Sequence, residues 1–72
     1  MPGTYFDCVW YRKALSAAGK ALQLSNELAE PMFVVHDIAA GMYGIGEGGQ
    51  EPDWCRDSNE INFICVIQPQ IH

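Results

Sequence analysis

The fold is decided by residues 12–30, which read RKALSAAGKALQLSNELAE. Polar residues recur there at intervals of three and four, which is the spacing of one stripe along a helix. They are Lys13, Ser16, Lys20, Gln23, Glu27 and Glu30. Pro31 stops the helix, because proline lacks the backbone N–H that a continuing helix needs. The pattern predicts an amphipathic helix that buries Leu15, Ala18, Leu22 and Leu28 and exposes Lys13, Lys20, Gln23 and Glu27.

The segments around this helix are rich in β-branched and aromatic residues, which favour strands. Strands are predicted at residues 4–11, 32–38 and 61–67, with a weaker return strand at 42–45. We therefore predict an α+β fold, a small β-α-β-β(-β) domain with one amphipathic helix packed on one face of a short sheet. Residues 1–72 suffice for one such domain with a modest core.

The last predicted strand is apolar on both faces. Strict alternation puts Ile61, Phe63, Cys65 and Ile67 on one face and Ile64 and Val66 on the other. One helix can cover only one face of a small sheet, so the second face needs a cover. That cover is either a second copy of the chain or residues 40–54, folded back with Met42, Tyr43, Ile45 and Trp54. We expect the second copy, and therefore a homo-oligomer, in its simplest form a dimer.

The net charge of −5 is concentrated in the second half of the chain, in and around a Gly-containing loop at residues 46–60. An acidic surface repels nucleic acid and anionic membranes but suits a partner protein with a basic surface. The residues predicted to meet that partner are Glu47, Glu51, Asp53, Trp54 and Asp57. Trp54 either docks the partner or folds back onto the core. We thus predict a small acidic non-catalytic interaction or accessory module, similar in type to inhibitor proteins of phages and mobile elements.

The cysteines indicate a reducing compartment. Cys8, Cys55 and Cys65 are odd in number and form no C-x-x-C motif, so a disulfide framework is not expected. The first residues lack the basic start and apolar core of a signal peptide, and no apolar run is long enough to span a membrane. We therefore expect a cytoplasmic protein. No ligand spacing typical of a metal site occurs, and neither a metal nor another cofactor is predicted.

Three further sequence patterns can be interpreted either as ordinary structural features or as parts of a functional site. Residues 44–49 match G-x-G-x-x-G, but no helix follows, so a turn is expected rather than a dinucleotide site. Cys55 and His36 could form a nucleophile–base pair, although no local signature supports it. Arg12 and Lys13 stand at the helix N-terminus, where they are either surface charges or part of an anion site.

One enzymatic alternative starts from Pro2. Met1-Pro2 leads directly into a predicted strand, one β-α-β unit follows, and Gly44-Ile45-Gly46 comes after the second strand. In these features the chain resembles the small tautomerase family, whose members use an amino-terminal proline as general base or acid. The resemblance implies that Pro2 would be the base and Arg12 the binder of a substrate carboxylate. A third alternative is an oligomer that binds a small ligand in a pocket between subunits, lined by aromatic residues.

Overall fold

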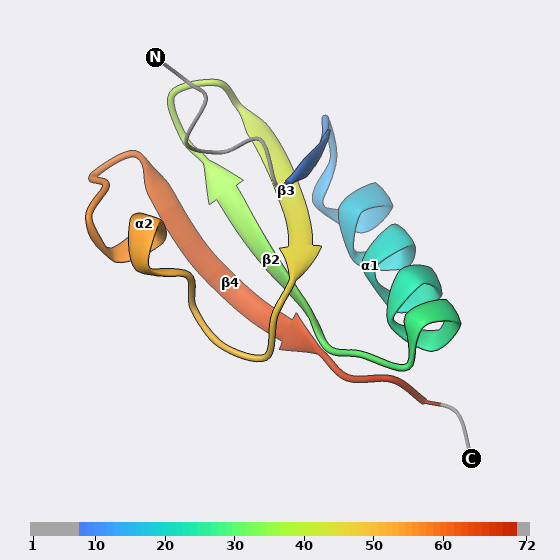
Figure 1. The fold of residues 1–72 in the computed structure, drawn as a ribbon. Helices are drawn as coiled ribbons and strands as arrows, with labels where there is room; N and C mark the ends of the chain where they lie inside the picture. Colours follow the sequence, from blue (N-terminus) through green and yellow to red (C-terminus); the bar gives the residue numbers. More distant parts are fainter. Residues whose placement is uncertain (1–7, 71–72) are drawn as a thin grey trace.

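The computed structural model describes residues 8–70. The elements are β1 (Val9–Tyr11), α1 (Ala14–Leu28), β2 (Met32–Asp37), β3 (Met42–Glu47), α2 (Asp53–Arg56) and β4 (Ile61–Ile67). The four strands form one sheet in the order β1-β3-β2-β4, and α1 packs against it (Figure 1). The predicted α+β fold is therefore confirmed. In the described part of the chain, no helix is long and apolar enough to cross a membrane.

All neighbouring strands in the sheet are antiparallel. Because β1 and β2 both run antiparallel to β3, they are parallel to each other, and β3 lies between them. The return strand is longer than predicted and reaches Glu47, while the segment predicted as a loop contains the short helix α2. The first predicted strand is present at Val9–Tyr11, and its residues 4–7 lie outside the described residues.

One face of the sheet is covered by α1 through small side chains. Ala17, Ala21 and Ser25 are fully buried. They follow one another at intervals of four, so they form a single narrow line along the helix. This line packs on Met32, Val34 and Ile45, with Tyr11, Leu24, Tyr43 and Ile67 around them. The buried Ser25 hydroxyl donates to the Ile67 carbonyl at 3.3 Å, which satisfies a polar group that would otherwise be costly to bury.

The prediction of which helix residues are buried was partly wrong. Lys13, Gln23 and Glu27 are exposed as predicted, but Leu15 is 85% exposed and Leu28 46% exposed. Ala18, Leu22 and Lys20 are half-buried. The small residues of α1 lie against the sheet, because alanine and serine let the helix backbone come close to the strands. The leucines lie to either side of this contact line and therefore stay partly exposed. An added Cβ at Gly19 would meet no atom within 4 Å, so the glycine does not mark a close approach.

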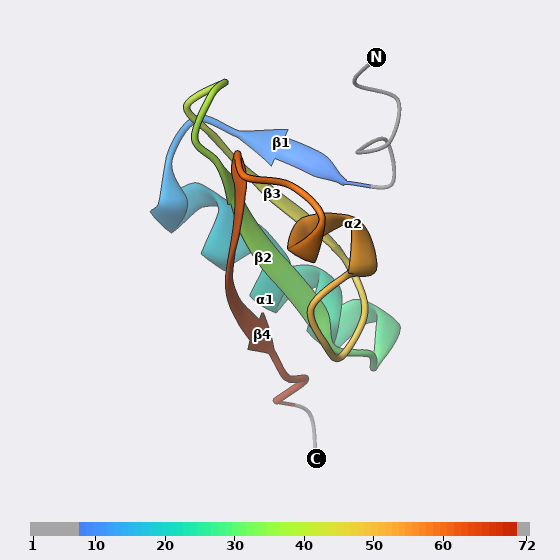
Figure 2. The same cartoon turned by 90° about the vertical axis from the view of Figure 1, so that its left-hand side faces the viewer.

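The opposite face carries a second core, which α2 covers (Figure 2). Its buried members are Cys8, Phe33, Val35, Cys55 and Ile61, with Trp10, Trp54, Phe63 and Val66 packed against them. A cover from within the chain, the less favoured of the two expectations, is thus present. It is made by Trp54 and Cys55 of α2, whereas Tyr43 and Ile45 pack on the α1 side, so their predicted place in the cover was wrong.

A β-bulge in β4 changes the predicted faces of that strand. Cys65 pairs with Val34, but the next pair is Phe63 with Val35, which leaves Ile64 as the extra residue. Ile61, Phe63 and Val66 consequently contribute to the core under α2, while Ile67 contributes to the core under α1. The expectation that Cys65 and Ile67 share a face with Phe63 was wrong, because strict alternation does not hold across a bulge.

The glycines of the G-x-G-x-x-G match make room for aromatic rings. Gly44 and Gly46 lie inside β3 rather than in a turn, which corrects the sequence expectation. A Cβ at Gly44 would lie 2.7 Å from the Trp10 ring, and one at Gly46 would overlap the Phe33 ring. These two positions therefore need glycine for close packing, and the structure gives them no role in holding a phosphate.

Candidate interaction surface

The helix α2 is stabilised at both ends by charge. Asp53 lies in its first turn and Arg56 in its last turn, the arrangement that complements the helix dipole. The Arg56 guanidinium also donates to the Asp53 carboxylate, and the two side chains form an exposed ion pair. Pro52, directly before the helix, has an extended backbone and starts the turn. These local interactions explain why a helix of one turn forms in a loop that is otherwise rich in glycine.

Two inward side chains anchor α2 on the sheet. The Trp54 ring meets the Phe33 ring edge-on, with the ring centroids 5.8 Å apart and the planes inclined by 69°. Cys55 is buried, and its Sγ donates to the Ile61 carbonyl at 3.5 Å. Because α2 is held to β2 and β4 in this way, its outer side has a fixed position relative to the sheet.

The structure brings together most of the predicted interaction residues. Asp53 and Asp57 are exposed at the two ends of α2, and Trp54 is half-buried between them. Glu51 is half-buried just before the helix. Glu47 is exposed at the end of β3, where its register partner is Met32. A cleft of about 330 Å³ is bordered by Phe33, Glu47, Pro52 and Trp54.

Cys55 and His36 lie on opposite faces of the sheet. Burial, followed by the negative charge of Glu51, raises the pKa of the Cys55 thiol. The thiol therefore keeps its proton at neutral pH, whereas a nucleophilic cysteine needs the thiolate. His36 stacks on Tyr43 with ring centroids 4.3 Å apart, and Tyr43 belongs to the opposite face of the sheet. The structure therefore does not bring Cys55 and His36 together.

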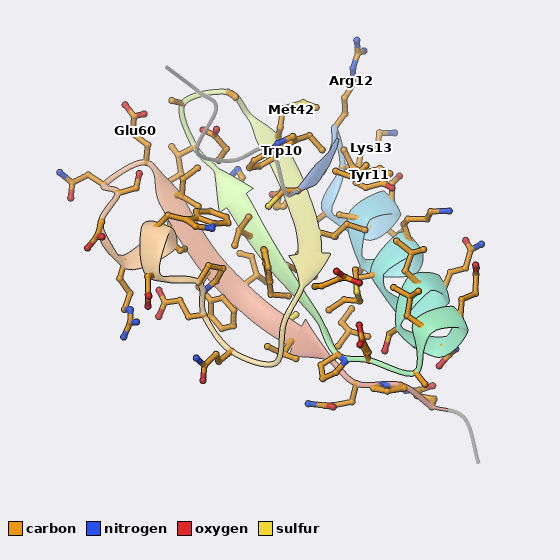
Figure 3. The ribbon with its side chains drawn as sticks, viewed as in Figure 1. Trp10, Tyr11, Arg12, Lys13, Met42 and Glu60 are labelled. Atoms are coloured by element: carbon orange, nitrogen blue, oxygen red, sulfur yellow. The ribbon has the colours of Figure 1, made fainter. Side chains whose placement is uncertain are left out.

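The positions of the basic and aromatic residues give no support to the alternative functions that were based on them. Arg12 and Lys13 are exposed at the junction of β1 and α1, and their side chains project away from the sheet (Figure 3). Pro2, the base implied by the tautomerase resemblance, lies outside the described residues. The aromatic residues are divided between the two faces, since Trp10 and Trp54 pack under α2 and Tyr11 and Tyr43 under α1.

Over residues 8–70, no three His, Cys, Asp or Glu side chains are grouped so that they could hold a metal ion. No protein-family model, curated protein or solved structure matches this chain. Sequence reasoning missed α2 itself, although Pro52 with Asp53 at the start and Arg56 three residues later is a recognisable signature of a short helix.

Proposed function

We propose that this protein is a non-catalytic interaction module that binds a partner protein with a basic surface. The binding region, called the acidic surface here, consists of Glu47, Glu51, Asp53, Trp54 and Asp57. One observation carries the proposal: α2 is anchored through Trp54 and Cys55 while the carboxylates of Asp53 and Asp57 stay exposed. Carboxylates on an anchored helix can meet a basic surface without first being ordered, which lowers the entropic cost of binding.

The charge around α2 supports the choice of partner. Residues 47–60 contain the carboxylates of Glu47, Glu51, Asp53, Asp57 and Glu60 against the single basic residue Arg56. Such a field accelerates the approach of a basic protein and opposes that of nucleic acid or an anionic membrane. The ion pair with Arg56 offsets part of the charge of Asp53, so Asp57 is the carboxylate on α2 that is most available to a partner.

A cytoplasmic location belongs to the same proposal. No disulfide joins any two of Cys8, Cys55 and Cys65. Free thiols persist in a reducing compartment and are readily oxidised outside it. Two of them, Cys8 and Cys55, are buried in the core under α2, where they pack as small hydrophobic residues.

The test measures binding of a fluorescently labelled, lysine-rich peptide by anisotropy at low and high salt. We expect binding that weakens as salt rises, because attraction between exposed charges is screened within about 8–10 Å. The double variant Asp53→Asn, Asp57→Asn should bind roughly 3- to 10-fold more weakly, which is the range expected for two exposed charge pairs. The matched control is Glu27→Gln, Glu30→Gln, which removes the same charge from the exposed end of α1.

Equal losses in the double variant and the control would show that only net charge matters, and would overturn the assignment to α2. Undiminished binding in the double variant would have the same consequence.

We also propose that the chain self-associates. With the second face of the sheet covered by α2, the reason for self-association differs from the one given by the sequence. Several large apolar side chains remain exposed at strands and turns, namely Val9, Ile38 and Ile64. A chain of 72 residues buries a smaller share of its surface than a larger domain does, so it gains from covering such side chains against another copy.

A further inference from the structure

We propose that the free edge of β4 is a two-fold interface at which a second copy of this chain adds its own β4. This inference rests on the self-association proposed above and names the surface that carries it. In the sheet formed by residues 8–70, β4 is hydrogen-bonded to β2 on one side and has no strand on the other. The backbone N–H and C=O groups along a free edge are ready to pair with another strand.

The edge lacks the usual protection against pairing. Natural edge strands carry lysine, other charges or proline, or are very short. β4 is the longest strand of the sheet with seven residues, and residues 61–67 contain neither a charge nor a proline. At the opposite edge, β1 has only three residues. The bulge at Ile64 is the one protective feature of β4, and it leaves Ile64 half-exposed on the strand.

The occupant is a second copy because of the distribution of charge. The chain carries a net charge of −5, so two copies repel each other wherever their acidic residues meet. Residues 61–70 carry no charge, so a second copy can approach the β4 edge without meeting like charges there. A basic partner is instead attracted to the carboxylates around α2.

The ends of β4 select an antiparallel arrangement about a two-fold axis. Glu60 directly precedes β4, and its side chain points away from the sheet (Figure 3). Parallel pairing would set one Glu60 beside the other. Antiparallel pairing centred on Ile64 places Glu60 of one copy opposite Gln68 of the other, where the amide can donate to the carboxylate. In the same arrangement, residues 61–63 of each copy pair with residues 65–67 of the other copy.

An open groove beside the same edge adds apolar surface to this interface. It has a volume of about 510 Å³ and is bordered by Ala18, Gly19 and Leu22 of α1 and by Val66 and Ile67 of β4. α1 and β4 are joined at one end of the groove, where Ser25 bonds the Ile67 carbonyl and Asn26 accepts from the Gln70 N–H at 2.7 Å. A strand added to β4 becomes a further wall of this groove, so pairing and apolar burial occur together.

The first experiment places a cysteine on the axis. The variant Ile64→Cys, Cys65→Ser is oxidised mildly and separated by non-reducing electrophoresis. Antiparallel pairing centred on residue 64 brings the two new thiols face to face, so we expect a covalent dimer. The matched control is Val9→Cys, Cys65→Ser, because Val9 is 53% exposed on the other edge strand and Ile64 is 50% exposed. The control should remain monomeric on the same gel.

The second experiment uses the chain without oxidation. Analytical ultracentrifugation should give a species of twice the 8.0 kDa of one chain. Ile64→Lys sets two positive charges face to face and should raise the dissociation constant about 100-fold or more, whereas Val9→Lys should leave it unchanged.

The outcomes separate this inference from the proposals on which it rests. A monomer at every concentration overturns both self-association and the β4 interface. A dimer that tolerates Ile64→Lys and gives no cross-link at residue 64 overturns the β4 interface and leaves self-association standing. Binding of the lysine-rich peptide is measured separately, so its loss or retention bears on the acidic surface alone.

Discussion

The two faces of the sheet are covered by opposite means. On one face, the fifteen-residue helix α1 lies close to the strands because Ala17, Ala21 and Ser25 are small. On the other face, the four-residue helix α2 is held by a large ring, Trp54, that meets Phe33. There the small residues are in the sheet itself, since Gly44 and Gly46 provide the space for the Trp10 and Phe33 rings.

The difference shows two ways to obtain close packing in a small domain. A helix can carry the small residues and bring its backbone to a sheet of large side chains. Alternatively, the sheet can carry the small residues, so that aromatic rings come close to its backbone. In the second case much of the apolar area under α2 depends on the few rings that the glycines admit. The two faces should therefore respond differently to substitution.

The largest effect is expected from Phe33→Ala. Phe33 is 5% exposed, lies over Gly46 and supports Trp54, so its removal opens a cavity and withdraws the support of α2. We expect a loss of about 3–5 kcal/mol in the free energy of unfolding, measured by urea denaturation. Such a loss is a large fraction of the stability of a small domain. The control Ile38→Ala removes an exposed side chain and should cost well under half as much. Similar losses in both variants would contradict the role given to Phe33.

A smaller effect is expected on the other face from Ala21→Leu. Ala21 is fully buried between α1 and the sheet, so the larger side chain forces the helix outward. Overpacking of this kind costs about 1–3 kcal/mol, measurable by the same denaturation. Ala14→Leu is the matched control, because it makes the same change at an exposed position of the same helix. If Ala21→Leu is as stable as the control, α1 does not depend on close approach.

The smallest effect concerns pH and the Cys55 thiol under α2. Burial and the neighbouring Glu51 raise the Cys55 pKa in the folded state above its unfolded value, which is about 8.5 for an ordinary cysteine. The thiol loses its proton more easily when the chain is unfolded. Stability is therefore complete below about pH 8.5 and falls as the pH rises towards the folded pKa.

The check is denaturation of the protein and of Cys55→Ala at a series of alkaline pH values. The variant should lose stability less steeply with pH than the parent chain. Identical pH dependence in the parent and in Cys55→Ala would show that Cys55 does not contribute.

The sequence predicted the elements whose signal is local. The α1 periodicity is repeated over four turns, so it predicts the helix to within about two residues at each end, and the apolar run at 61–67 predicts β4 with its observed bounds. It did not predict which leucines are buried, because that depends on how closely α1 approaches β2 and β3. The bulge at Ile64 also has no local signal, since it arises from the pairing of β4 with β2.

The acidic surface was only partly predictable for a related reason. The carboxylates were found from charge alone, and Asp53, Trp54 and Asp57 do lie together on α2. Sequence could not show that Trp54 rests on Phe33, because those residues are brought together by the sheet. Nor could it show that Glu47 shares a cleft with Pro52 and Trp54, because the register of β3 on β2 decides that position.

The strand order β1-β3-β2-β4 has a consequence for the order of folding. β2 and β3 are joined by a short turn in which the Asp37 carboxylate accepts from the Ala40 N–H at 3.0 Å. In contrast, the chain between β1 and its partner β3 contains α1 and β2, and the chain between β4 and its partner β2 contains β3 and α2. Closing a long loop costs more entropy than closing a short turn, so the central hairpin should form first and serve as the template. Substitutions in that turn should then slow folding, whereas substitutions in the outer strands should mainly speed unfolding.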